Sequence, residues 1–264
     1  MKLIDTVRTS LCVGALVMAG AYSAPSSAVV VVWSTTNAGS PAVGSTAGNT
    51  RTYAANSGTT TATASAFSDT NTNTSPRTIE SAFLVSYGTS GLGVTNRDAC
   101  TTYSSSCDRN EGTSPEHSID NNGRYDSVLL SFTQAVVLTG VNIGWYSNDS
   151  DFSVLRYTGT GAPTLAGLAY NALTGNGWSV VGNYSNPGTG WEAINATGQS
   201  SFYWLVVAYN SAFGTINDGC GGGDDYIKLA GVKGEVLQQV PEPATLGLLG
   251  LSLVGLGFAR RRAK

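Results

Sequence analysis

Residues 136–146, with the sequence VVLTGVNIGWY, decide the fold class of this chain. The stretch is rich in β-branched and aromatic residues, and Asn and Asp residues follow it directly. Five further stretches share this composition, separated by clusters of Gly, Asn, Asp and Pro: residues 127–132, 152–157, 178–184, 202–209 and 226–236. Short strands with turn-sized gaps, and no alternation with long helical patterns, predict an all-β chain with an antiparallel sandwich or jelly-roll-like domain. Residues 163–173 are expected to hold one short helix, with Pro163 in its first turn.

The composition argues against several other classes of protein. Only 12% of the 264 residues are charged, against about 25% in ordinary globular domains, and 33 residues are Gly. Helical bundles and coiled coils use far more Glu, Lys and Arg than this chain contains. Nucleic acid is not an expected partner, because no basic patch is available to neutralise phosphates.

The first part of the chain has the pattern of an export signal. Lys2 and Arg8 precede an apolar run at residues 11–21, and small residues follow at 26–28. This pattern predicts a secretory signal peptide at residues 1–28, because the apolar run is too short to span a bilayer. Residues 29–58 are dominated by Ser, Thr, Gly and Ala and are expected to form a low-complexity leader. The sandwich domain is expected at residues 59–237, beginning with a weak strand.

The last 27 residues, 238–264, combine three features in a fixed order. Pro241, Glu242 and Pro243 come first, and residues 244–259 form a Gly- and Leu-rich apolar run. A basic cluster of Arg260, Arg261 and Arg262 ends the run. Sixteen helical residues span about 24 Å, so a single transmembrane helix is expected, with its basic end in the cytoplasm. The two prolines keep Glu242 extended and outside that helix.

This order of motif, apolar helix and basic cluster resembles the PEP-CTERM sorting signal of Gram-negative bacteria. The resemblance implies processing by exosortase, a membrane-embedded enzyme with a catalytic cysteine that cuts near the motif. It also implies export through the inner membrane, transient anchoring by the C-terminal helix, and a final place at the cell surface or outside the cell.

The middle of the chain carries a second resemblance, which covers roughly residues 60–235. In order, the segments 91–96, 116–121, 126–132, 141–145 and 149–151 look like those of a family of exosortase-dependent surface proteins. The resemblance supports the localisation and implies no enzymatic activity.

Three cysteines remain once Cys12 leaves with the signal peptide. An exported chain meets an oxidising periplasm, so a disulfide is expected. Cys100 and Cys107 bracket a Ser- and Thr-rich loop and are the expected pair, while a bridge from either of them to Cys220 stays open.

Clusters of Asp and Asn suggest calcium ligands. Asp120 with Asp126, and Asp149 with Asp151, each place hard oxygen ligands within one short loop, and Asp218 with Asp224 and Asp225 does the same. Extracellular calcium sites work at millimolar concentration and accept such flexible loops. The alternative is that these residues serve as turn formers, which their side chains favour.

Aromatic side chains suggest a carbohydrate ligand. Trp178, Tyr184 and Trp191 are candidates for stacking on sugar rings, with Trp191 in a Gly-rich loop as the best exposed candidate. Trp204 is expected in the core, because the residues that follow it are apolar on both faces of a strand.

Catalysis has little support in the sequence. His117 is the one histidine and the one candidate general base, and a pairing with Cys220 has no support from spacing. Glu111, Glu116 and Glu192 could serve a glycoside hydrolase only if the fold brought two of them together across a sugar site. We therefore expect a non-catalytic structural or adhesive protein of the cell surface or extracellular matrix. The alternative is a module that binds exopolysaccharide, with calcium as a possible aid, and a hydrolase is the least favoured.

Overall fold

The structure is a computed structural model of the whole chain. It describes residues 26–36, 46–69, 77–98, 100–104, 107, 117–216 and 223–239, and, near the C-terminus, residues 250, 251, 253, 257, 258 and 260–262. Residues 28–238 form one compact unit, the first of two into which the chain divides. The strands described below belong to the first unit, apart from the outermost residues of β1 and β13.

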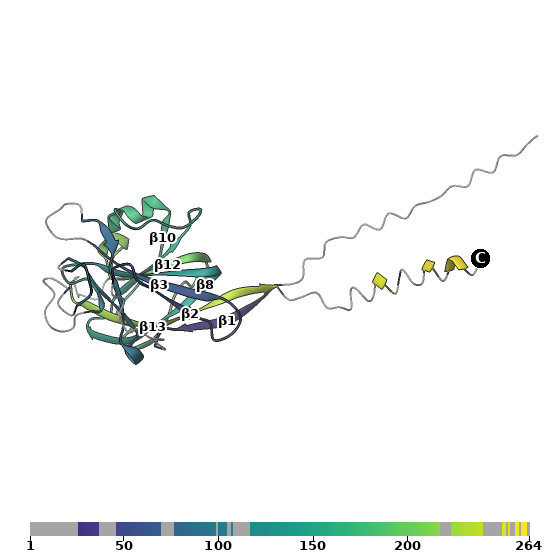
Figure 1. The fold of residues 1–264 in the computed structure, drawn as a ribbon, viewed down its shortest axis with the longest axis horizontal. Helices are drawn as coiled ribbons and strands as arrows, with labels where there is room; N and C mark the ends of the chain where they lie inside the picture. The colour runs from purple at the N-terminus through teal and green to yellow at the C-terminus, as the bar shows by residue number, and fades with distance from the viewer. Residues whose placement is uncertain are drawn as a thin grey trace, which may run out of the picture. The chain divides into compact units, whose positions relative to one another are not determined.

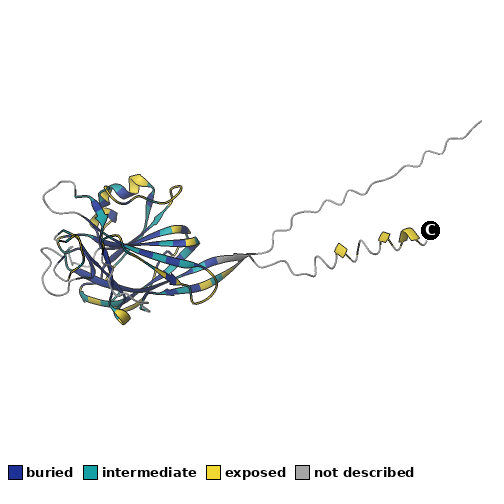
Figure 2. Cartoon of the chain, viewed as in Figure 1, coloured by how far each residue is buried: buried dark blue, intermediate teal, exposed yellow. Residues whose placement is uncertain are grey.

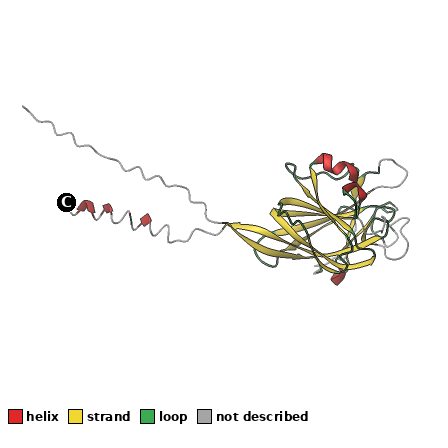
Figure 3. Ribbon diagram, turned by 180° about the vertical axis from the view of Figure 1, so that it is seen from behind, coloured by secondary structure: helices red, strands yellow, loops and turns green. Residues whose placement is uncertain are grey.

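Antiparallel strands make up most of the domain (Figure 3), and every register described between two named strands is antiparallel. The strands are β1 (Ser26–Ser34), β2 (Thr50–Ala54), β3 (Thr61–Asp69), β4 (Ile79–Ser81), β5 (Phe83–Ser86), β6 (Leu92–Thr95), β7 (Ile119–Asp120), β8 (Asp126–Asn148), β9 (Phe152–Tyr157), β10 (Trp178–Tyr184), β11 (Gly190–Ala193), β12 (Ser201–Ala208) and β13 (Asp225–Gln239). Three short 3-10 helices lie in the connections: η1 (Gly88–Ser90), η2 (Tyr170–Asn176) and η3 (Ser211–Phe213). The prediction of an all-β fold is confirmed.

The long strand β8 belongs to both layers of the sandwich. Its first part, residues 126–132, pairs with β3 on one side and β12 on the other (Figure 1). Its second part, residues 136–148, pairs with β13 and, over four residues, with β11. The first sheet therefore has the order β10-β9-β12-β8-β3-β2, and the second has the order β11-β8-β13-β6-β5, with β1 and β7 also on β13.

The central core lies between these two sheets. Val128 and Leu130 from the first part of β8 belong to the same buried cluster as Val141 and Ile143 from its second part. Trp204 on β12 is fully buried in this cluster, as its apolar surroundings in the sequence predict. Buried residues follow the strands through the interior of the domain (Figure 2). Alternate residues of each strand point to opposite faces, so the inward-facing set fills this core.

The outer face of the first sheet carries a second apolar cluster. Leu155, Leu205 and Val207 point away from the central core and pack against the β9–β10 connection, which contributes Leu165 and Leu173. This connection thus forms a third layer, and it explains why β12 is apolar on both faces. Its helical turn is η2, which begins seven residues after Pro163 rather than at it and ends at Gly177 in the left-handed conformation.

A third apolar cluster covers the outer side of β5. Phe83 and Val85 pack against Cys107, with Cys100 and Tyr103 alongside. Cys100 and Cys107 form a disulfide, so the closed loop that carries them lies over this edge of the second sheet. Cys220 lies outside the described residues.

Two glycines, one just before β6 and one within it, are required because another backbone segment passes close to each of them. Gly91 has φ of 98°, and a Cβ atom there would lie 2.2 Å from the carbonyl oxygen of Leu229. A Cβ atom on Gly93 would lie 1.8 Å from the carbonyl oxygen of His117. Any larger residue at either position would push β6 away from β13 or from the segment that leads into β7.

The expected leader at residues 29–58 is corrected by the structure. β1 pairs with β13, and β2 pairs with β3, so both strands are part of the sandwich. Val31 and Trp33 are fully buried in the central core, and Tyr53 joins them. The segment is held by strand pairing and by Trp33, whose indole donates a hydrogen bond to the carbonyl of Thr60. β1 also begins at Ser26, inside the segment expected for the signal peptide.

Most of the expected transmembrane helix at residues 244–259, together with the motif Pro241, Glu242 and Pro243, lies outside the described residues. In the part of the chain that the structure describes, no helix is both long and apolar enough to cross a membrane. Arg260, Arg261 and Arg262 are described as helical and exposed.

Candidate functional site

Three buried carboxylates meet at one end of the second sheet. Asp149 and Asp151 lie in the β8–β9 connection, and Asp225 is the first residue of β13. One carboxylate oxygen from each lies within 4.8 Å of the others, and the three residues are 4%, 1% and 2% exposed. We call this set the aspartate triad. Among the described residues, these three side chains lie close enough together to share one metal ion.

Backbone pairing brings the triad together. Asp149 forms a parallel bridge with Asp225, because the amide of Tyr226 donates to the Asp149 carbonyl and the amide of Asp149 donates to the Asp224 carbonyl. The amide of Asp151 donates to Oδ1 of Asp225 over 3.0 Å. The strand pairing of β8 with β13 therefore places residues 74 positions apart side by side.

Hydrogen bonds fix most of the triad's oxygen atoms. Oδ1 of Asp149 accepts from the amide of Ser150 at 2.7 Å, and Oδ1 of Asp151 accepts from the amide of Asn186 at 2.7 Å. Oδ2 of Asp149 is buried and has no hydrogen-bond partner among the described residues. A buried carboxylate oxygen without a donor is costly, so this atom needs a ligand or a proton.

Asn121 connects the triad to the β7–β8 loop. Its side-chain amide donates to Asp225 Oδ2 and to the carbonyl of Tyr209, and its Oδ1 accepts from the amides of Gly223 and Asp225. Three of these contacts hold Asp225 and the segment that leads into β13, and the fourth joins Asn121 to the residue after β12.

Burial disfavours the charged form of Asp225, the triad residue at the start of β13. Burial raises the pKa of Asp225 to about 7; the hydrogen bond from Asn121 lowers this pKa, and the nearby charge of Asp149 raises it. Neither Asp149 nor Asp225 forms a salt bridge with a described basic side chain. Lys228, three residues along β13, has its Nζ atom over the rings of Trp145 and Tyr87.

The other expected calcium pair, Asp120 and Asp126, is not part of the triad. Asp120 accepts hydrogen bonds from the hydroxyl of Ser118 and the amide of Asn122, and its charge acts on Lys228. Asp126 is the first residue of β8 and is buried. The structure thus joins Asp149 and Asp151 to Asp225, a residue that the sequence placed in a separate cluster.

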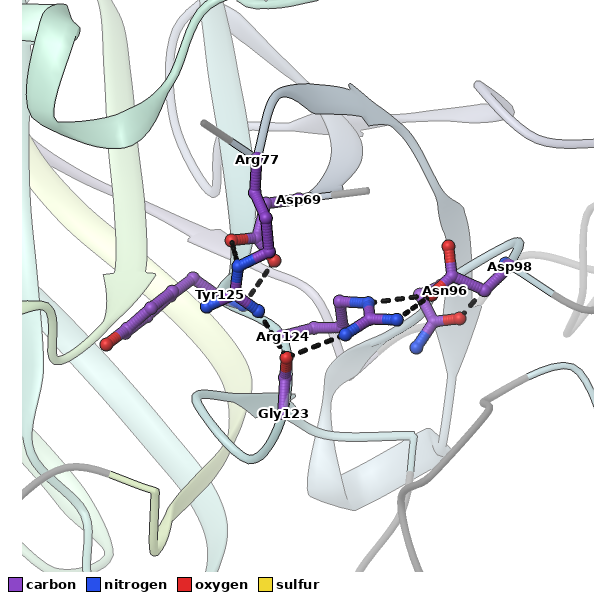
Figure 4. A network of polar contacts seen from close by, with 7 residues as sticks. All are labelled: Asp69, Arg77, Asn96, Asp98, Gly123, Arg124 and Tyr125. Atoms are coloured by element: carbon purple, nitrogen blue, oxygen red, sulfur yellow. Dashed lines mark hydrogen bonds and ion pairs between the residues drawn. The ribbon is translucent and has the colours of Figure 1, made fainter. Parts of the chain in front are cut away.

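A second polar network joins the ends of three connections (Figure 4). Arg124, which is 1% exposed, forms a buried salt bridge with Asp98, and its Nε atom donates to Asp98 Oδ2 at 2.7 Å. Nearby, Arg77 pairs with Asp69, which accepts a hydrogen bond from the amide of Tyr125. Each charged side chain in this network has a partner of opposite charge.

The three aromatic candidates do not share one exposed face. Trp178 is 2% exposed and packs against Tyr157 in the cluster outside the first sheet. Tyr184 stacks on Phe152 at 5.0 Å and packs against the central core. Trp191 is 42% exposed. Of the three, Trp191 alone offers an open ring face, because burial removes Trp178 and the stacking partner covers Tyr184.

Trp191 lies on a floor of small residues on the second sheet. It pairs with Asn142 of β8, which in turn pairs with Gly231 of β13, so the three share a face. A Cβ atom on Gly140 would lie 2.4 Å from Cε of Lys233, which shows that the Lys233 side chain lies flat on Gly140. Its Nζ atom is 4.9 Å from the centre of the Trp191 ring. Sequence reasoning found Trp191 but not Lys233, because their proximity depends on strand register.

The candidate catalytic residues are only partly described. Nδ1 of His117 is 3.2 Å from the hydroxyl of Thr95, and its backbone has φ of 61°. Glu192 lies on β11. Glu111, Glu116 and Cys220 lie outside the described residues.

The comparison with protein families identifies the C-terminal segment. Residues 239–262 match the PEP-CTERM protein-sorting motif. The match contains Pro241, Glu242 and Pro243 as well as the arginine cluster at 260–262, and it leaves the resemblance of the middle region as a prediction. No curated protein and no solved structure matches the chain. The chain therefore carries a PEP-CTERM sorting signal, which directs it to exosortase and to export to the cell envelope or surface.

Proposed function

We propose that the domain is a non-catalytic structural or adhesive protein at the surface, or in the extracellular matrix, of a Gram-negative bacterium. In this proposal the helix at residues 244–259 holds the chain in the inner membrane until exosortase cuts near Pro241–Pro243. The sorting signal supports the destination of the chain.

The observation that carries the non-catalytic role is the use of the acidic side chains. Six described Asp residues are 4% exposed or less: Asp69, Asp120, Asp126, Asp149, Asp151 and Asp225. Most accept hydrogen bonds from backbone amides of neighbouring loops, as Asp69 does from Tyr125 and Asp225 does from Asp151. A glycoside hydrolase instead needs two carboxylates facing a sugar across about 5–10 Å. The acids described here stabilise loops.

The test compares cells with and without the chain. Deletion of its gene is expected to lower adhesion to a solid surface and cohesion of cell aggregates, and expression of the full chain is expected to restore both. The purified chain is expected to release no reducing sugar from the exopolysaccharide of the same bacterium. Unchanged adhesion together with release of reducing ends would overturn the proposal in favour of a hydrolase.

A second candidate function, binding of exopolysaccharide, has support from Trp191 and Lys233. An exposed indole face stacks on the apolar face of a sugar ring, and an ammonium group beside it suits an acidic sugar. The glycine floor under Lys233 leaves this part of the sheet flat, which suits a long polysaccharide chain better than a small molecule.

Co-sedimentation of the purified full chain with exopolysaccharide tests this second function. Trp191→Ala is expected to lower the bound fraction at least tenfold. The matched control is Phe202→Ala, because Phe202 is an exposed aromatic residue, 49% exposed, on β12 of the other sheet. Equal losses in both variants, or a loss in Phe202→Ala alone, would rule out the Trp191 surface as the sugar site.

A further inference from the structure

We propose that Asp149, Asp151 and Asp225 bind one Ca²⁺ ion, which fastens the start of β13 to the β8–β9 connection. This inference goes beyond the proposed function, because it holds whether or not the domain binds polysaccharide.

The first support is a buried carboxylate oxygen of Asp149 that has no hydrogen-bond partner among the described residues. Asp149 is 4% exposed. Its Oδ1 accepts a hydrogen bond from the Ser150 amide, whereas its Oδ2 has no hydrogen-bond partner among the described residues. The two other carboxylates of the triad each present an oxygen within 4.8 Å. Three carboxylates this close in a buried site repel one another unless a cation lies between them or one of them takes up a proton, and a bound cation would relieve the repulsion of all three.

The second support is the way in which donors hold the carboxylates. The amides of Ser150, Asn186 and Asp151 each bind one oxygen of a triad residue. Such donors fix the orientation of a carboxylate, as the outer shell of a metal site usually does, and in Asp149 they leave Oδ2 without a partner among the described residues. Asp149 and Asp225 are thus held by amide donors, and neither forms a salt bridge with a described basic side chain.

The ligand atoms select the type of cation. Carboxylate oxygens are hard ligands, which suit Ca²⁺ or Mg²⁺, whereas Zn²⁺ favours His and Cys side chains. Ca²⁺ accepts six to eight oxygens at irregular angles, including backbone carbonyls and water, while Mg²⁺ requires a near-ideal octahedron and retains several waters. The triad takes its ligands from two separate segments of the chain, which suits the irregular geometry of a Ca²⁺ site. Exported proteins also meet the millimolar calcium at which extracellular sites work.

The site would link several connections at one end of the domain. Asp151 accepts from the amide of Asn186 in the β10–β11 connection, and its carbonyl accepts from the amide of Tyr209 after β12. Asn121 carries the linkage to the β7–β8 loop. An ion bound only by the folded chain raises its thermal stability in proportion to the logarithm of ion concentration.

The experiment uses the purified full chain, freed of metal with EDTA and then titrated with CaCl₂. Thermal unfolding is expected to shift upward by about 5 °C or more at millimolar Ca²⁺, and calorimetric titration is expected to give one ion per chain. MgCl₂ at the same concentration is expected to give a smaller shift. An equal shift with Mg²⁺ would overturn the assignment to Ca²⁺, and no shift with no heat of binding would overturn the site.

The informative variant is Asp149→Asn. It keeps the acceptor for the Ser150 amide and replaces the unpartnered oxygen with a donor that can reach the neighbouring carboxylates. We expect this variant to unfold at a higher temperature than the unchanged chain in EDTA and to lose its response to Ca²⁺. A variant that is misfolded would instead unfold at a lower temperature in EDTA and would have an altered circular dichroism spectrum. These two measurements therefore distinguish loss of the ion site from loss of the fold.

Two matched controls complete the test. Asp224 lies next to Asp225 but is not part of the triad. Asp224→Asn is therefore expected to keep the calcium response. Asp120→Asn tests the other acidic loop and is also expected to keep it. Loss of the response in Asp120→Asn with retention in Asp149→Asn would overturn the assignment of the ion to the triad.

Discussion

The outer faces of the two sheets differ in how they are covered. Leu155, Leu205 and Val207 on the outside of the first sheet lie under the β9–β10 connection, and together they form an apolar third layer. The second sheet carries Trp191, Lys233 and glycines on its outer side, and Trp191 remains 42% exposed.

The comparison shows that the pattern of apolar residues in a strand depends on whether one or both of its faces are buried. β12 reads as a continuous apolar run because both of its faces are buried, whereas the second part of β8 alternates between buried and partly exposed residues. The covered face therefore serves stability, and the open face is available for a partner.

The largest expected effect comes from a cavity under the covered face. Leu205→Ala removes a fully buried side chain from the outer cluster and is expected to lower the free energy of unfolding by about 2–5 kcal/mol. Val137→Ala on the second sheet is the matched control, because Val137 is only partly buried, and it is expected to cost less than about 1 kcal/mol. Urea unfolding measures both. Similar costs in the two variants would remove the distinction between the faces.

A smaller effect is expected where the second sheet is covered locally. The disulfide between Cys100 and Cys107 closes a short loop over Phe83 and Val85. Replacing both cysteines with Ser is expected to lower the free energy of unfolding by about 2 kcal/mol, chiefly because the unfolded chain gains freedom. Urea unfolding under non-reducing conditions measures it. A loss as large as that of Leu205→Ala would mean that this loop is as essential as the third layer.

Lys228 makes the second sheet sensitive to pH. Burial lowers the pKa of Lys228 to about 8, from a usual value of 10.5, and the charge of Asp120 acts in the opposite direction. Because the unfolded chain binds more protons than the folded chain between these two values, stability is expected to rise with pH from about 8 towards 10. Lys228→Met is expected to flatten this rise in a series of urea unfolding curves. A rise of equal slope in the variant would exclude Lys228 as its source.

The smallest expected effect is that of Trp191→Ala on stability. Since Trp191 rests on small residues and is partly open to solvent, its removal is expected to cost about 1 kcal/mol or less in urea unfolding. A cost near that of Leu205→Ala would mean that Trp191 is part of the core and would weaken its role as a binding surface.

The sequence predicted the apolar strands from residue 127 onward and the weak strand at the position of β3, and it missed β1 and β2. β9 and β10 lie at the predicted residues 152–157 and 178–184. β2 was missed because Tyr53 stands in Thr- and Ala-rich surroundings, and β1 was missed although four valines precede Trp33, because that run was assigned to the leader that follows the signal peptide. The burial of both strands depends on a partner strand. Ala62, Ala64 and Ala66 of β3 are also fully or almost fully buried. Alanine gives a weak signal in the sequence, yet it allows two sheets to pack closely.

The candidate site was predicted in part, for the same reason. Asp149 and Asp151 stood out as neighbours in one loop, but their association with Asp225 depends on the pairing of β8 with β13. The Gly-rich surroundings of Trp191 indicated its exposure, but the burial of Trp178 was missed, because the third layer that covers it comes from a connection without a clear periodic pattern.

The position of β13 determines how the domain would respond to mechanical force. This strand ends at Gln239, where the sorting motif begins, and it is paired with β8 on one side and with β1 on the other. If the chain is pulled through its C-terminal end, tension along β13 would load the hydrogen bonds to both neighbouring strands in shear. Many of these bonds would have to break together before the strand could leave, whereas tension across a strand opens them one at a time. A pull through this end of the chain would thus act on a strand that is held on both sides.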